Sequence, residues 1–292
     1  LTVGSGSSLG TGPLTLNGGT LNLNNSAQTF SSLTGSGDVS LGSGQVLTVA
    51  TASGSDSYSG SLDGAGALIK SGNGTLVLTS SNAYTGPTTV SAGKLVVNGE
   101  LTGSSAVTVT GGILGGGGII SSSVTINSGG TISPGNSPGT MTTGNEDWNT
   151  GGNYVWEINK ADGTQGADPG WDFLDIGGTL TINSTPGNPF VIKITSLTLG
   201  NTAGLAAGFV RFQPYTFTIA TADNPIVNFS ADKFLIDTSA FFNDPTNIGG
   251  FAIVQSLDGL SLNLTYTAIP EPGTWAAGAF LVLLALARRR RA

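Results

Sequence analysis

Apolar and polar residues alternate along the first half of this chain in a short unit that recurs. Each unit has an apolar-Thr-apolar triplet, a glycine turn and a second apolar pair. The clearest triplets lie at 14–16, 107–109 and 124–126, with glycine pairs at 18–19, 111–112 and 129–130. The last two triplets are 17 residues apart, and a longer self-match relates residues 33–49 to 62–78 at an offset of 29. Residues 1–144 are therefore predicted to be a repeat region.

The alternation inside each unit has a period of two, which is typical of β-strands with one buried face. Glycine pairs supply the turns that need positive φ angles. Units of this size cannot bury an apolar face alone and must stack on one another. The predicted fold is all-β, a right-handed parallel β-helix (solenoid). An antiparallel β-sandwich is the alternative, because hairpin strands alternate in the same way.

Residues 145–268 have a different composition. Phe30, Tyr58 and Tyr84 are the aromatic residues before position 144, whereas this region is rich in Trp, Tyr and Phe and carries 12 of the 16 acidic residues that precede position 269. Predicted strands lie at 153–158, 174–182, 190–199, 215–220, 251–255 and 260–267, with 234–238 either a strand or a turn. We interpret the region as an aromatic-richer continuation or cap of the β-helix, with a separate β module as the alternative.

The last segment, residues 269–292, has three parts. Pro270 and Pro272 disfavour helix and paired strand. An uncharged apolar run at 275–287 favours helix, and arginines at 288–291 favour the cytoplasmic side of a membrane. Thirteen helical residues span about 20 Å, less than the roughly 30 Å hydrocarbon core. The pattern predicts a short transmembrane helix that holds the chain transiently; a permanent tail anchor is the main alternative, and a core helix fits poorly because the run has no polar face.

The amino-acid composition argues against several classes of function. Residues 1–269 carry 16 acidic and 6 basic residues, a balance of −10, so we expect no nucleic-acid partner. The chain has no cysteine and no histidine, which excludes a disulfide scaffold and thiolate zinc sites. It begins at Leu1 with strand-like sequence, so we interpret it as a fragment or processed product, and the missing leader carries no information.

Catalytic chemistry finds little support in the repeat region. Its acidic residues are Asp38, Asp56, Asp63 and Glu100, which occupy different positions in their units. Lys70 and Lys94 are interpreted as exposed strand or turn residues. No histidine is present to activate the abundant serines. We therefore expect no enzyme activity, no catalytic residue and no cofactor.

Two groups in the second region are candidates for binding. Asp162, Asp168, Asp172 and Asp175 could offer oxygen ligands to calcium, but their spacing matches no known calcium loop, so solvated loop acids are expected and no metal site is predicted. Glu146 and Asp147 lie beside Trp148. Trp148 and Trp171 are candidate ligand contacts, although an aromatic residue beside a turn is more often part of a core.

The tail as a whole resembles the PEP-CTERM sorting signal of Gram-negative bacteria. The resemblance rests on Pro270-Glu271-Pro272, the apolar run at 275–287 and the arginine cluster Arg288, Arg289, Arg290 and Arg291, in that order. It implies recognition by an exosortase, a membrane protease-transpeptidase, and removal of the helix and arginines. Pro270, Glu271 and Pro272 are then a substrate motif, and the inner membrane holds only an intermediate.

A second resemblance covers roughly residues 60–144. The stretch 66–78 reads Gly-Ala-Leu-Ile-Lys-Ser-Gly-Asn-Gly-Thr-Leu-Val-Leu, and Asn-Ala-Tyr-Thr-Gly follows at 82–86. With Thr88-Thr89-Val90 and Gly93-Lys94-Leu95, this looks like the autotransporter-associated β-strand repeat, at about 60–97. The stretch 133–140 resembles the segment that closes such repeats. The resemblance implies a β-helical surface or secreted protein.

Together these features favour a non-enzymatic exported protein, a structural component of the cell surface or extracellular matrix. Its expected partners are an exosortase, the membrane through the tail, and an exopolysaccharide. A surface adhesin or carbohydrate-binding protein is the alternative, with the aromatic-rich region as its contact surface. A β-helical polysaccharide lyase or hydrolase is the third hypothesis.

Overall fold

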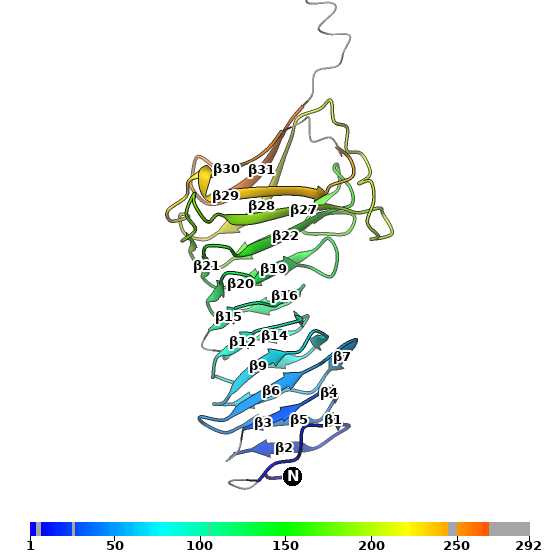
Figure 1. The fold of residues 1–292 in the computed structure, drawn as a ribbon, viewed down its shortest axis with the longest axis vertical. Coiled ribbons are helices and arrows are strands. Elements are labelled where there is room, and N and C mark those ends of the chain that lie inside the picture. Colours follow the sequence, from blue (N-terminus) through cyan, green and yellow to red (C-terminus); the bar gives the residue numbers. More distant parts are fainter. Residues whose placement is uncertain (4–6, 25–26, 105, 245–249, 269–292) are drawn as a thin grey trace, which may run out of the picture.

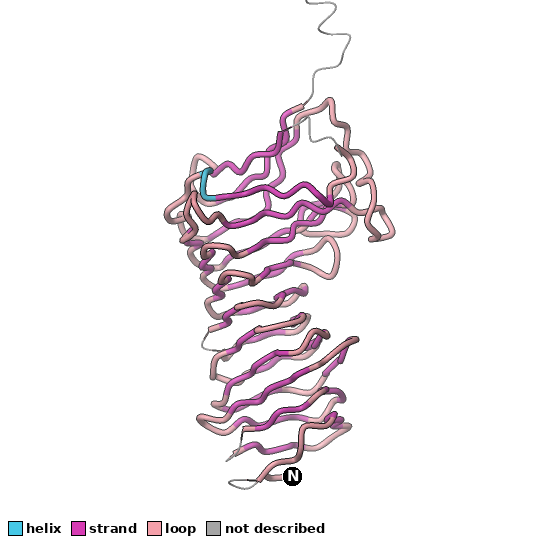
Figure 2. The backbone as a smooth tube through the Cα atoms, viewed as in Figure 1, coloured by secondary structure: helices cyan, strands magenta, loops and turns pink. Residues whose placement is uncertain are grey.

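The computed structural model describes residues 1–3, 7–24, 27–104, 106–244 and 250–268. These residues form an elongated stack of strands (Figure 1). Within the described ranges the helical content is a single 3₁₀ turn, η1 (Ala231–Lys233), visible as the one cyan segment in Figure 2. The described residues form an all-β solenoid, as the alternation predicts.

Up to residue 182, each turn of the solenoid contributes strands to three faces. The first face is a 12-stranded sheet. Its strands are β1 (Pro13–Leu16), β4 (Ser32–Gly35), β7 (Ser55–Tyr58), β10 (Thr75–Leu78), β13 (Lys94–Val97), β16 (Ile113–Gly116), β19 (Thr131–Pro134), β22 (Asn153–Ile158), β27 (Phe190–Ser196) and β29 (Phe234–Ala240), with β23 (Thr164–Gln165) and β24 (Gly170–Trp171) attached to β22.

The second face is an eight-stranded parallel sheet. Its strands are β3 (Gln28–Phe30), β6 (Val46–Ala50), β9 (Ala67–Ser71), β12 (Thr88–Val90), β15 (Val107–Val109), β18 (Val124–Ile126), β21 (Glu146–Trp148) and β26 (Leu180–Ile182).

The third face consists of two sheets in succession. The first comprises β2 (Thr20–Leu23), β5 (Asp38–Leu41) and β8 (Leu62–Gly64); the second comprises β11 (Ser81–Asn82), β14 (Glu100–Leu101), β17 (Ile119–Ile120), β20 (Thr140–Thr143), β25 (Phe173–Ile176), β28 (Tyr215–Ala222), β31 (Ser261–Thr267) and β30 (Gly250–Gln255). Backbone bonds from Ala83 to Leu62 and from Thr85 to Gly64 join the two.

Strands of successive turns pair in parallel, which excludes the antiparallel sandwich for the repeat region. The triplets at 107–109 and 124–126 pair residue for residue, as their sequence similarity predicts. Partner positions up to residue 143 are 17 to 23 residues apart. The handedness of the coil stays a prediction.

The 29-residue self-match does not reflect the turns of the solenoid. Leu33 pairs with Leu14 on the first face, whereas Leu62 pairs with Val39 on the third face. Strands on all three faces show the same alternation, as β5, β6 and β10 do, so the sequences of two different faces can match as well as those of two successive turns. The offset was therefore wrong as a repeat length.

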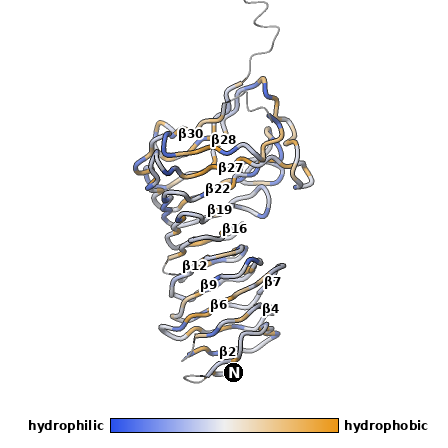
Figure 3. The backbone as a smooth tube through the Cα atoms, viewed as in Figure 1, coloured by the Kyte–Doolittle hydropathy of each residue, from blue (hydrophilic) through white to orange (hydrophobic). Residues whose placement is uncertain are grey.

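The interior is a continuous apolar core. Leu95, Leu114 and Ile132 form one of its columns, with each side chain directly above the last, and all three are completely buried. Figure 3 shows hydrophobic and hydrophilic segments distributed along the whole stack, because successive side chains in a strand point alternately inward and outward.

The turns become wider after residue 140. Partner positions on β22 and β27 are 38 residues apart, and aromatic residues fill the larger interior. The stack ends with β28, β31 and β30, which pair antiparallel to one another. The prediction of 153–158 matches β22, while 174–182 is two strands, β25 and β26, separated by a turn; 234–238 lies within strand β29.

Glycine is sterically required where the backbones of two turns approach closely. A Cβ atom on Gly118 would lie 2.1 Å from the carbonyl oxygen of Gly99 one turn below. The neighbouring Gly117 is different, because the nearest atom to its Cβ position is the carbonyl oxygen of Thr140 at 3.5 Å, an ordinary contact.

This pair gives a matched test of the stacking. We expect Gly118→Ala to lower the free energy of unfolding by about 1–3 kcal/mol, because the turns must separate to admit the methyl group. Gly117→Ala should change it by no more than about 0.5 kcal/mol. Urea unfolding followed by circular dichroism measures both, and equal stability of the two variants would contradict the close approach.

Candidate functional site

Trp148, a predicted ligand contact, lies in the core. Its side chain is completely buried in an interior column between Ile126 and Ile182. Its ring stacks on Phe190 with centroids 4.5 Å apart. The ring therefore offers no face to an external ligand, and the prediction of a surface contact is wrong for this residue.

Trp171 is only partly buried. Its Nε1 donates a hydrogen bond to the backbone oxygen of Thr218 at 3.2 Å, and its ring meets Phe217 edge-on at 5.1 Å. Both interactions hold the indole against the solenoid. Contact of its remaining exposed surface with a ligand stays a prediction.

Glu146 is a completely buried acid, although its sequence neighbours, Asn145 and Asp147, are polar. It occupies an interior column between Val124 and Leu180, and its Oε2 accepts a hydrogen bond from Trp148 Nε1 at 3.2 Å. Burial raises the pKa of Glu146 to about 8, with a smaller contribution from the charge of Asp147. The side chain is therefore mostly neutral at pH 7, which makes its place in an apolar column tolerable.

The four aspartates considered for calcium do not form a common site. Asp172 is completely buried and accepts backbone hydrogen bonds from Gly139 and Glu157, both at 2.9 Å. The expectation of a solvated loop acid is thus wrong for Asp172. Among the described residues, no group of three or more His, Cys, Asp or Glu side chains could hold a metal ion.

Asp168 belongs to a separate polar cluster. Its two oxygens accept hydrogen bonds from the amides of Asn159, at 2.7 Å, and Asn201, at 2.6 Å. Asn159 also donates to Asn201 at 2.8 Å. These bonds lower the pKa of Asp168, the one from Asn201 contributing most. The cluster links two wide loops, and its polar atoms are already used in doing so.

Lys70 is completely buried, so the expectation of an exposed strand or turn residue is wrong. Its Nζ donates to the backbone oxygens of Ser71, Gly72 and Ala92 at 2.6 to 3.3 Å. Burial lowers the pKa of the ammonium group, and the charge of Asp56 partly opposes this. Three carbonyls thus solvate the cation inside the coil.

Lys94 lies half-buried on the outside of the first face. Burial raises the pKa of Asp172 and of Glu157, and the charge of Lys94 partly opposes both shifts. Lys94 therefore partly compensates two acids that lie on later turns.

The acids of the repeat region use their oxygens in local hydrogen bonds. Asp38 and Asp63, on successive turns, both lie within hydrogen-bond reach of the Ser61 hydroxyl, at 2.9 and 2.7 Å. The structure therefore brings together two carboxylates that occupy different positions in their sequence repeats. Asp56 accepts from Ser32 at 2.8 Å and from Thr51 at 2.6 Å.

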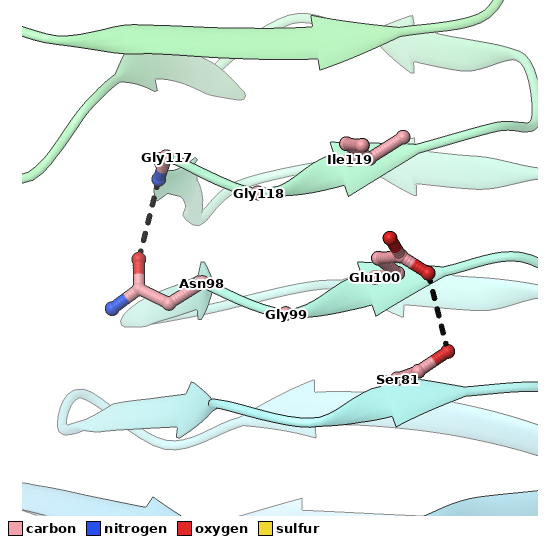
Figure 4. A pocket seen from close by; sticks show the side chains of 7 residues that line it. All are labelled: Ser81, Asn98, Gly99, Glu100, Gly117, Gly118 and Ile119. Atoms are coloured by element: carbon pink, nitrogen blue, oxygen red, sulfur yellow. Dashed lines mark hydrogen bonds between the residues drawn. The ribbon is translucent and has the colours of Figure 1, made fainter.

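Glu100 borders a shallow pocket of about 440 Å³ on the third face (Figure 4). Ser81, Glu100 and Ile119 are in register on three successive turns. The glycines 99, 117 and 118 form the adjoining wall, and Asn98 stands at its rim.

The polar atoms of this pocket are only partly engaged. Asn98 Oδ1 accepts hydrogen bonds from Gly117 N at 3.2 Å and from Asn136 Nδ2 at 2.8 Å. Ser81 Oγ donates to Glu100 Oε2 at 3.4 Å. Ile119 is 41% exposed. The pocket combines an amide, a carboxylate and an apolar side chain, and it is a candidate binding site on the described surface.

The tail predictions fall outside the described residues. These are the motif Pro270, Glu271 and Pro272, the apolar run at 275–287 and the arginines at 288–291. Within the described ranges, no helix has the length and hydrophobicity needed to cross a membrane.

Comparison with known families gives one match. Residues 68–97 match the family described as passenger-associated-transport-repeat, and this stretch holds β9 to β13, more than one full turn of the solenoid. The match confirms the predicted autotransporter-associated repeat in this part of the chain. The chain matches no curated protein.

Glu146 should make stability depend on pH. Its pKa is about 8 in the fold and 4.5 as a free side chain, so the folded state holds a proton that the unfolded state has released between these values. The stabilisation is complete below pH 4.5 and is lost as the pH rises to 8. We expect Glu146→Gln, which is neutral throughout, to lose less stability than the wild type over this window.

Thermal and urea unfolding at pH 5, 7 and 9 measure this dependence. Asp223→Asn is the control, because this carboxylate is exposed and does not contribute to the raised pKa of Glu146, so its pH profile should follow the wild type. Parallel profiles for Glu146→Gln and the wild type would refute the neutral buried acid.

Lys70 gives a second test of the interior polar groups. Lys70→Met keeps an unbranched side chain, one atom shorter, but removes the donor, so we expect about 1–3 kcal/mol lower stability from the carbonyls that lose their partner. Lys160→Met removes the surface ion pair with Asp162 and should cost no more than about 1 kcal/mol. Equal losses in urea unfolding would count against the interior role of Lys70.

Proposed function

We propose that this chain is a non-enzymatic exported protein of a Gram-negative bacterium, an elongated structural component of the cell surface or extracellular matrix. The observation that carries the proposal is the passenger-associated repeat at 68–97 within a parallel β-solenoid. A surface-exposed repeat protein fits both.

The use of the buried polar groups supports a scaffold. Lys70 and Asp172 are completely buried and bound to backbone atoms, and Glu146 lies in the core. A catalytic group must reach its substrate, and these groups do not reach the surface. Their interactions are made inside the solenoid.

An elongated coil also suits the role of a spacer. Each turn adds the inter-strand distance of about 4.8 Å to the length of the stack, and each turn contacts chiefly its neighbours. Length can therefore be built up by repetition without enlarging the core.

We propose that the tail, residues 269–292, acts as a sorting signal. The proposed sequence of events is export, arrest of the apolar run 275–287 in the inner membrane with the arginines on the cytoplasmic side, and exosortase cleavage near Pro270, Glu271 and Pro272. The support is the sequence pattern and the shortness of the run relative to the hydrocarbon core. The product would be displayed on the surface or released.

Mass spectrometry of the protein recovered from its native cells tests this sorting. We expect the mature chain to lack Arg288–Arg291 and to occur in surface or medium fractions. Replacing Pro270, Glu271 and Pro272 by alanine should leave the arginines in place and hold the chain in the inner membrane.

The control is Gly18→Ala, at a position open to solvent, which should be processed as the wild type is. A wild-type chain that keeps Arg288–Arg291 at the surface would defeat the sorting proposal and leave a tail anchor. A chain found only in the cytoplasm would defeat the exported role itself.

A further inference from the structure

The pocket beside Glu100 is not explained by the packing of the solenoid. Close stacking requires glycine at 99 and 118, where a Cβ atom would lie 2.1 Å from the carbonyl oxygen of the turn below. It does not require glycine at 117, where the contacts of a Cβ atom would be ordinary. The absence of a side chain at 117 leaves the pocket open, and the packing of the turns does not require this absence.

The hydrogen bonds fix the orientation of Asn98. Oδ1 accepts from both Gly117 N and Asn136 Nδ2, and Figure 4 shows Nδ2 on the side of the amide that faces away from Glu100 and Ile119. Within the described residues Nδ2 has no acceptor. Asn98 thus presents an oriented pair of donors at the rim, held by two bonds that a ligand need not break.

Glu100 supplies the complementary acceptor. Within the part of the chain that the structure describes, its carboxylate accepts one hydrogen bond, the long one from Ser81. Its second oxygen is free to accept from a ligand, and Ile119 one turn further offers an apolar surface. Glu100 and Ile119 are in register on adjacent turns, about 4.8 Å apart, and Asn98 lies two residues before Glu100 on the same turn.

A ligand for this pocket needs hydroxyl groups that both donate and accept, together with a C–H face for Ile119. The seven lining residues include one carboxylate and no lysine or arginine, and the chain before position 269 is acidic. Uronate, sulfate or phosphate groups would be repelled. These features describe an uncharged sugar.

We propose that this pocket binds a neutral saccharide, with Glu100 accepting from a hydroxyl of the sugar whose ring packs on Ile119, and with Asn98 Nδ2 donating at the rim to a hydroxyl of an adjoining sugar. Ser81, Glu100 and Ile119 are in register along the axis, and Thr142 follows on the next turn. An extended polysaccharide would therefore lie along the third face, parallel to the long axis.

Native affinity electrophoresis of the full chain tests the site. The protein is kept in a polyoxyethylene detergent, which carries no sugar headgroup, and runs through gels that contain hydroxyethyl cellulose, galactomannan or dextran, or acidic alginate. We expect retardation by at least one neutral polymer and none by alginate. Binding in this assay does not depend on export or on processing of the tail.

Three variants connect binding with the pocket. Asn98→Asp keeps the acceptor for Gly117 but replaces the outward donor, and Glu100→Gln removes the charged acceptor; each should weaken binding about tenfold. Gly117→Leu should fill the pocket and abolish retardation. Gly187→Leu is the matched control, because the Cβ position of Gly187 is open, and it should bind like the wild type.

Circular dichroism and the unfolding midpoint of each variant verify the fold, so that a loss of binding reports on the pocket. The proposal is overturned if none of the three neutral polymers retards the wild type, or if alginate retards it more strongly than they do. It is also overturned if well-folded Gly117→Leu binds as the wild type does.

Discussion

The in-register hydrogen-bond ladder between successive turns is the constraint on which the rest of this structure depends. Parallel pairing places equivalent residues directly above one another, about 4.8 Å apart. A column of side chains must then be compatible along its length, as with Leu95, Leu114 and Ile132. Where a corner of one turn rests on another, no side chain fits, and Gly118 meets this need. One ladder therefore dictates both the apolar interior and the glycine-rich corners.

The same ladder decides what happens to polar residues. A polar side chain that falls in an interior column cannot turn away, so it must find partners there or change its charge. Lys70 binds three backbone oxygens, Asp172 accepts two backbone N–H groups, and burial keeps Glu146 protonated near neutral pH. On the outside of the solenoid the constraint is weaker, because polar side chains can reach solvent. Stacked polar residues there also form hydrogen bonds to each other, as Asn149 does to Asn127 at 2.8 Å.

Period-two alternation was enough to predict the fold class and many strands, because each strand buries one face. It was not enough to identify turns or assign individual residues to the interior. Leu33 and Leu62 match in pattern but lie on different faces. The burial of Lys70 follows from its register with Val49 and Val90, and register depends on turn lengths that vary from 17 to 23 residues. Trp148 was wrongly predicted as a surface contact for the same reason. Its position in an interior column determines its burial, and its polar sequence neighbours do not.

The pocket beside Glu100 could not be found from sequence, because it joins residues from three turns whose register the repeat pattern left open. Its glycines also look alike in sequence while differing in cause. Gly118 is explained by the backbone of the turn below, and any solenoid with this corner would need it. Gly117 is not, since a side chain there would meet only ordinary contacts. Stacking therefore explains the glycine at 118 but not the missing side chain at 117. A bound ligand is the better explanation for the space that Gly117 leaves open.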